Sequence, residues 1–139
     1  MQSVIHTFHI NKPQTEVYTA LTTITGLASW WTEDTIGGTG LGDSIYFTFG
    51  NYATFEFQVS LLDVGKLVSW KFIGGNPDWD NTHVTFVLST DENKTKVEFV
   101  HDGFKEEYPN FGNINFTWAG YLSSLREYCE TGKGQPFSM

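Results

Sequence analysis

The sequence predicts an α+β fold in which a curved antiparallel sheet of six or seven strands wraps around one long C-terminal helix. Two observations carry this prediction. Apolar side chains recur at helical spacing in residues 113–130, whereas apolar and polar side chains mostly alternate in residues 43–101. Such alternation is typical of strands with one covered face and one face in water, and the helix is the expected cover. With 139 residues, the chain is expected to form a single domain over residues 1–139.

The N-terminal part is expected to form one strand followed by two short helices. Residues 3–10 alternate and predict the first strand. Residues 14–24 have apolar side chains at helical spacing, and residues 26–31 predict a second short helix or turn. The glycine-rich segment 36–43 lacks the GxGxxG and Gly-Lys-Ser/Thr patterns of phosphate-binding loops, so it is expected to be a loop between strands.

Alternation predicts the remaining strands at residues 44–49, 52–62, 66–73, 82–89 and 95–101. In the second of these, the period of two places Leu61 on the inward face together with Val59. The loop at residues 74–81 contains Trp79 between two acidic residues. This side chain is either exposed, as a lid over a cavity mouth or a partner contact, or folded back on the rim of the protein.

The terminal helix has one apolar stripe, formed by Trp118, Leu122, Leu125 and Cys129. Gly132 is expected to end this helix. The tail at residues 133–139 is expected either to lie loose or to dock through Phe137.

Composition excludes several classes of partner. The formal net charge is -8 and no stretch concentrates Lys and Arg, so neither a nucleic acid nor an anionic membrane surface is an expected partner. There is no window of 18 apolar residues and no basic leader before an apolar run, so neither a membrane span nor a signal peptide is expected. The expected location is therefore cytoplasmic. A single cysteine cannot form an internal disulfide.

Several short motifs occur along nearly the whole chain, namely INKP (10–13), VYTAL (17–21), GLASWW (26–31), LVSW (67–70), VTF (84–86), HDGF (101–104) and YCETG (128–132). In this order they resemble the family of homologues of the activator of heat-shock protein 90 ATPase, within the START-like (SRPBCC, helix-grip) superfamily. The resemblance implies a helix-grip fold around an apolar cavity that binds a hydrophobic small molecule. The eukaryotic founders act on a chaperone, largely through an additional N-terminal domain that this chain is not expected to contain.

The leading hypothesis is therefore a binding module for a hydrophobic small molecule, with no cofactor. Its expected ligand-binding residues are Trp31, Phe47, Phe55, Phe57, Trp70, Phe72, Phe86, Phe99, His101, Trp118, Leu122 and Leu125. The alternative for these residues is a solid aromatic core, since 17% of the chain is aromatic. The second hypothesis is a co-chaperone-like interaction module. The third is a cyclase- or hydrolase-like enzyme using the same cavity.

The four histidines do not predict a metal site, because His6 and His101 face inward while His9 and His83 lie on the opposite faces of their strands. His101 either provides a polar group on the pocket wall or is a buried side chain satisfied by a backbone carbonyl.

For the enzyme hypothesis, the candidate acids and bases are Glu33 and Asp34, or Asp102 beside His101. No nucleophile motif accompanies them, so no catalytic residue is assigned. The chain is expected to be a monomer or a homodimer, with Trp79 and Tyr108 as candidates for a dimer face.

Overall fold

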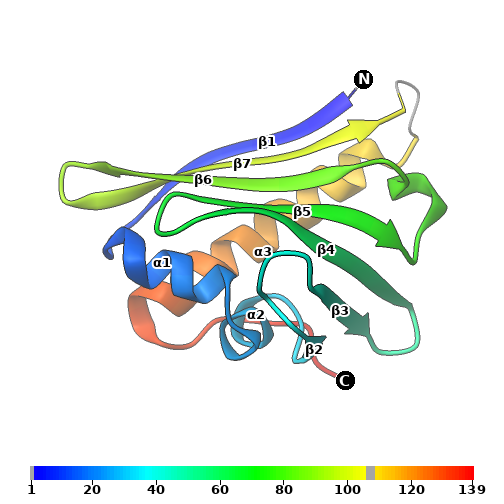
Figure 1. The fold of residues 1–139 in the computed structure, drawn as a ribbon, viewed down its shortest axis with the longest axis horizontal. Helices are drawn as coiled ribbons and strands as arrows, with labels where there is room; N and C mark the ends of the chain where they lie inside the picture. Colours follow the sequence, from blue (N-terminus) through cyan, green and yellow to red (C-terminus); the bar gives the residue numbers. More distant parts are fainter. Residues whose placement is uncertain (1, 106–108) are drawn as a thin grey trace.

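The computed structural model describes residues 2–105 and 109–139. In chain order its elements are β1 (Gln2–Ile10), α1 (Gln14–Leu21), α2 (Ile24–Trp30), β2 (Asp34–Gly37), β3 (Ser44–Phe49), β4 (Ala53–Asp63), β5 (Leu67–Gly74), the 3-10 turn η1 (Pro77–Trp79), β6 (His83–Asp91), β7 (Lys94–Phe104) and α3 (Phe111–Thr131). The strands form one antiparallel sheet in the order β1-β7-β6-β5-β4-β3-β2. The predicted α+β, helix-grip fold is confirmed (Figure 1).

The long helix α3 runs along one side of the curved sheet, and α1 and α2 lie at one end of it (Figure 1). Helix α3 buries Ile114, Trp118, Leu122 and Leu125, which recur every three or four residues and therefore form one face of the helix. The helix ends at Gly132, as predicted. Gly132 has a left-handed backbone with φ of 86°, and its N–H donates to the Tyr128 carbonyl at 2.8 Å.

The C-terminal tail docks beside β2 through Phe137. The Phe137 N–H donates to the carbonyl of Trp31 at 2.8 Å, and the Phe137 carbonyl accepts from the N–H of Glu33 at 3.0 Å. Of the two alternatives for the tail, the docked one is therefore observed.

The predicted helix over residues 14–24 is in fact divided between α1 and α2. Helix α1 ends at Leu21, and the Thr23 hydroxyl accepts a hydrogen bond from the Gly26 N–H at 3.0 Å. Thr23 is thus the N-cap of α2, and a capping threonine marks a helix start. The indole N–H of Trp30 donates to the Ala20 carbonyl at 3.0 Å and ties the two helices together.

Two details of the sheet differ from the prediction. The first residues of the glycine-rich segment belong to β2, which pairs with β3. Leu61 is 56% exposed rather than inward, because the register of β4 against β5 shifts between Val59 and Leu61. Such a bulge inserts one extra residue, so every side chain after it changes face and Leu62 takes the half-buried position.

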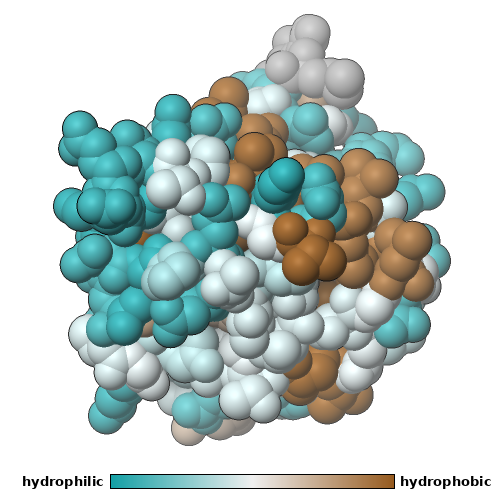
Figure 2. All heavy atoms as spheres, turned by 60° about the vertical axis from the view of Figure 1, so that its left-hand side comes forward, coloured by the Kyte–Doolittle hydropathy of each residue, from teal (hydrophilic) through white to brown (hydrophobic). Residues whose placement is uncertain are grey.

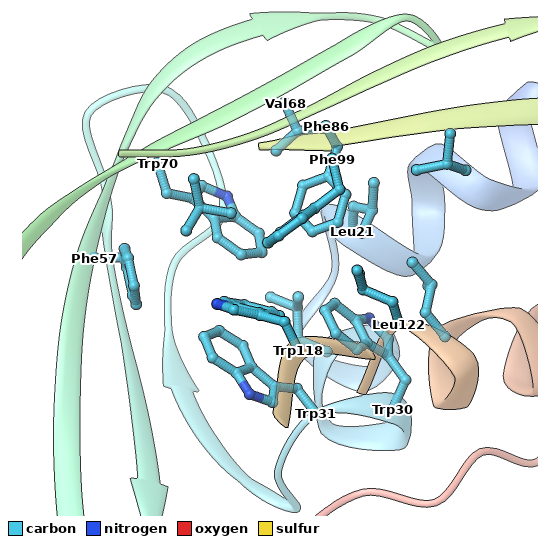
Figure 3. Packing of buried hydrophobic residues seen from close by; sticks show 14 of the residues in the cluster. Leu21, Trp30, Trp31, Phe57, Val68, Trp70, Phe86, Phe99, Trp118 and Leu122 are labelled. Atoms are coloured by element: carbon cyan, nitrogen blue, oxygen red, sulfur yellow. The ribbon is translucent and has the colours of Figure 1, made fainter. Parts of the chain in front are cut away.

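The space between the sheet and the helices is largely filled by aromatic rings. Rings from the sheet, such as Trp70 and Phe99, point toward Trp30 of α2 and Trp118 of α3 (Figure 3). The ring centroids of Phe99 and Trp118 are 4.7 Å apart, and those of Trp70 and Phe86 are 5.4 Å apart. The middle of the molecule is therefore a packed core.

Some large apolar side chains lie on the surface instead. Figure 2 shows that hydrophobic atoms gather toward one side of the face in view, while hydrophilic atoms cover the other side. The exposed apolar residues include Ile5, Leu61 and Val87 on strands and Phe116 on α3. Phe116 is 81% exposed, so the outer face of α3 has an unusually large apolar side chain in water.

Candidate functional site

One end of the space between the sheet and α3 is left as a cavity that opens to the surface. It has a volume of about 310 Å³ and lies between β3, β4, η1 and the N-terminal half of α3. Half of the described lining residues are aromatic, namely Trp31, Phe49, Tyr52, Phe55, Trp79, Trp118 and Tyr121. The polar lining residues are Asn76, Asp78, Asn110, Asn113 and Thr117. Only Ala53 and Ile114 are aliphatic among the described lining residues.

Trp31 and Trp118 form the boundary between the cavity and the packed core. Trp31 is the C-cap residue of α2, with its N–H donating to the Leu27 carbonyl at 2.9 Å. The centroids of the two indole rings are 4.9 Å apart, and the Trp31 ring also lies 4.2 Å from Phe47. Both side chains are at most 3% exposed, so their packing against the core holds them in place.

Trp79 folds back over the sheet and forms another wall of the cavity. The side-chain oxygen of Asn76 accepts a hydrogen bond from the Asp78 N–H at 3.0 Å and caps η1, which directs Trp79 inward. Trp79 is 7% exposed, and its ring lies 4.6 Å from Phe55. Its buried indole N–H has no hydrogen-bond partner among the described residues. Of the two alternatives for Trp79, the ring folded back on the rim is therefore observed, and the side chain is not exposed for a dimer face. Tyr108 lies outside the described residues.

His101 lies behind the cavity wall, in a chain of buried hydrogen bonds. The Trp118 indole N–H donates to His101 Nδ1 at 3.0 Å, and His101 Nε2 lies 3.0 Å from the Thr82 hydroxyl. An indole can only donate, so Nδ1 accepts and the neutral ring has its proton on Nε2. That proton is donated to the Thr82 oxygen, and the Thr82 hydroxyl donates to the Trp79 carbonyl at 2.6 Å. These hydrogen bonds thus link α3, β7 and η1 behind the site.

Burial lowers the pKa of His101 from 6.5 to about 3, with a smaller contribution from the charge of His83. The imidazole is therefore neutral at physiological pH. Both ring nitrogens are already hydrogen bonded, so the group is a positioning element for Trp118. Of the two alternatives for His101, the buried side chain is observed, with the Trp118 indole and the Thr82 hydroxyl as partners in place of a backbone carbonyl.

The sequence of the chain matches a family model over residues 11–130, described as Activator of Hsp90 ATPase homolog 1-like protein. The chain belongs to this family. Among solved structures, the family member is similar to the solution structure of the Aha1 dimer from Colwellia psychrerythraea, with 38% identity and a TM-score of 0.88. That comparison covers 96% of this chain and 100% of the other.

More distant structures share the fold of this family member. SSP2350 from Staphylococcus saprophyticus has 16% identity and a TM-score of 0.80, with 97% of each chain covered. MLL2253 from Mesorhizobium loti has 18% identity and a TM-score of 0.78, with 91% of this chain and 95% of the other covered. No curated protein matches the sequence. Among the described residues, no helix is both long enough and apolar enough to cross a membrane.

The predicted site residues of this family member fall into two groups. Trp31, Phe55 and Trp118 line the cavity. The others are buried in the core behind it, namely Phe47, Phe57, Trp70, Phe72, Phe86, Phe99, His101, Leu122 and Leu125. Phe49 and Tyr121 also line the cavity and were not among the predicted residues, although Phe49 has the inward parity of Phe47 and Tyr121 follows Trp118 by one helical turn. Tyr52 and Asn76 lie in turns, where no periodicity marks a lining residue.

The candidate acids and bases do not converge on the cavity. Glu33, Asp34 and Asp102 are exposed and are not among the lining residues, and His101 is enclosed. Within the part of the chain that the structure describes, no group of three or more His, Cys, Asp or Glu side chains is placed to hold a metal ion. Among the described lining residues, the groups available to a ligand are therefore aromatic rings, phenol and threonine hydroxyls, amides and the Asp78 carboxylate.

Proposed function

We propose that the protein binds a small molecule with an apolar body in the aromatic cavity at the open end of the sheet. The observation that carries this proposal is the cavity of about 310 Å³, in which half of the described lining residues are aromatic. This volume is near the lower end of ligand pockets, which span about 300–1,000 Å³. We therefore expect a ligand with one or two rings, because the packed core beyond Trp31 and Trp118 leaves no room for a long chain.

Binding can be tested through the tryptophans that line the cavity. N-phenyl-1-naphthylamine, a neutral aromatic probe, should quench tryptophan fluorescence on titration, because Trp31, Trp79 and Trp118 line the site. An Ala53→Phe variant should lose this response, since the added ring occupies the cavity. Thr54→Phe is the matched control, because Thr54 is the next residue of β4 and is exposed. A wild-type response in the Ala53→Phe variant would exclude this cavity as the site.

A second candidate function is self-association through the outer face of α3. The relative from Colwellia psychrerythraea, 38% identical, is a dimer. In this acidic chain, residues 109–125 contain no charged side chain, and this stretch includes Phe116. Interface cores are depleted in charge and enriched in aromatic side chains. A hollow on this face is lined by Phe116, Gly120, Ser123 and Glu127 among others, and we expect it to receive the Phe116 ring of a second copy.

Sedimentation equilibrium tests this assembly. We expect a dimer for the native chain and a monomer for Phe116→Ser. An Ile5→Ser variant, which removes an exposed apolar side chain from β1, should stay dimeric. A native chain that is monomeric at high concentration would contradict the assembly, and a dimer lost only in Ile5→Ser would move the interface to the sheet.

A chaperone-directed role is supported by the description of the family and stays a prediction for this chain. Its test is the ATP turnover of a heat-shock protein 90 chaperone with and without this protein. No stimulation at saturating concentration would exclude it.

A further inference from the structure

We infer that the ligand of the aromatic cavity is an organic cation, in which an amine or quaternary ammonium group is attached to an apolar body. This inference rests on the proposed function, because it names the chemical class that the same cavity takes. It is carried by the charge and by the kind of apolar surface that line the site.

The charge of the lining is negative. Among the described lining residues there is no Lys, Arg or His, and the carboxylate is Asp78 on η1. Asp78 is exposed beside the buried Trp79, and the Asn76 cap holds this turn through the 3.0 Å hydrogen bond to the Asp78 N–H. Burial raises the pKa of Tyr121, so its phenol stays neutral. An anionic ligand would meet an uncompensated carboxylate, whereas a cation would meet its counterion.

The apolar lining is aromatic rather than aliphatic. A pocket for an acyl chain or another neutral aliphatic body needs only Leu, Ile, Val or Met, yet Ile114 and Ala53 are the aliphatic residues among the described lining. Aromatic rings offer something more, because the negative face of the π system attracts a cation. Tryptophan is the strongest of the three aromatic residues in this respect, and three tryptophans line the site.

The rings also come from several sides. Phe49 and Phe55 belong to neighbouring strands, Trp79 to η1, and Tyr121 to α3, where its ring lies 6.2 Å from the Phe49 ring. Their planes are inclined to one another, with angles of 50° between Phe49 and Phe55 and 60° between Phe49 and Tyr121. A set of inclined rings around a space, with a carboxylate at its rim, is the arrangement that binds ammonium groups in aromatic cages.

The test compares two probes of the same shape and different charge. Phenyltrimethylammonium and tert-butylbenzene differ by the exchange of a positively charged nitrogen for carbon. Calorimetry at physiological salt should give a dissociation constant about tenfold lower for the cation, from cation–π contacts and a screened carboxylate. Asp78→Asn should reduce this preference, while Asp63→Asn, at the other end of β4, should keep it.

A second pair of variants tests whether the aromatic ring of Tyr52 contributes more to cation binding than an apolar side chain of another shape would. Tyr52 is 86% exposed at the cavity rim, so its replacement leaves the fold intact. Tyr52→Phe should keep the preference for the cation, and Tyr52→Leu should weaken cation binding more than binding of tert-butylbenzene.

The outcomes distinguish this inference from the proposed function. Equal or tighter binding of tert-butylbenzene would overturn the inference and leave the proposed function standing. An equal loss of the preference for the cation in the Asp78→Asn and Asp63→Asn variants would also overturn it, because the preference would then be due to the net charge of the protein and not to Asp78. If neither these probes nor N-phenyl-1-naphthylamine binds, the proposed function fails as well.

Discussion

Buried His101 should make the stability of the fold depend on pH between about 3 and 6.5. Its pKa in the folded protein is lowered to about 3, mainly by burial, whereas an unfolded chain has a histidine pKa near 6.5. Below pH 6.5 the unfolded state therefore takes up a proton that the folded state refuses. Acid stabilises the unfolded state, and the free energy of unfolding falls as the pH falls.

The magnitude follows from the proton linkage. The free energy of unfolding falls by up to about 1.4 kcal/mol for each pH unit, and it is lower by about 2 kcal/mol at pH 5 than at pH 8. Above pH 6.5 the ring is neutral in both states, so this contribution to the pH dependence vanishes.

Urea unfolding followed by tryptophan fluorescence at pH 8 and pH 5 measures the effect in the native chain and in two variants. His101→Gln and His101→Leu remove the titrating ring. From pH 8 to pH 5, the free energy of unfolding of each variant should therefore fall by about 2 kcal/mol less than that of the native chain. The two variants differ in packing and hydrogen bonding at pH 8, because leucine leaves Trp118 and Thr82 without their partner. If both variants lose the pH dependence of stability, the cause is therefore the missing titration of His101. An unchanged dependence in both variants would refute the reasoning.

Three further predictions concern the surroundings of the site. Trp118→Phe should lower the free energy of unfolding by about 1–3 kcal/mol in urea at pH 8, because the buried Nδ1 of His101 loses its donor; an unchanged midpoint would contradict this. Gly75→Ala should destabilise the protein, because Gly75 has φ of 122° and an added Cβ would meet backbone atoms of β4. Gly112→Ala in the first turn of α3 should not destabilise it, since a Cβ added at Gly112 would have open space around it. Equal losses of stability in thermal unfolding would argue against the steric cause. Cys129 has its pKa raised to about 12, mainly by burial, so it should react with a thiol reagent at pH 8 only slowly until urea unfolds the chain, and rapid labelling of the folded protein would disprove this.

The sheet and the terminal helix could be predicted because each has a simple period. Alternation assigned Phe47, Phe57 and Trp70 to the inner face, and all three are buried. The same rule failed at Leu61, because a bulge changes the face of each following residue without a strong signal in the sequence. Periodicity thus identifies an inward face until the register shifts.

The cavity could be predicted only in part, because its walls depend on tertiary geometry. Periodicity cannot distinguish an inward ring that packs, such as Phe86, from one that borders open space, such as Phe55. Trp79 reaches its place through a capped turn at Asn76, and Tyr52 through the β3–β4 turn. Turn conformations and the distance of α3 from the sheet decide these positions, and neither has a period in the sequence.

The two tryptophans at the inner end of the cavity belong to the core and to the site at once. Trp31 stacks against Trp70 at 6.2 Å on the core side, and Trp118 is hydrogen bonded to buried His101. Substitutions there will change folding stability and ligand affinity together, so they cannot assign a function. Tyr52 and Asp78 are exposed on the rim, so their side chains contribute little to the core. A loss of binding at the rim without a change in unfolding free energy is therefore the result that would separate recognition from folding in this fold.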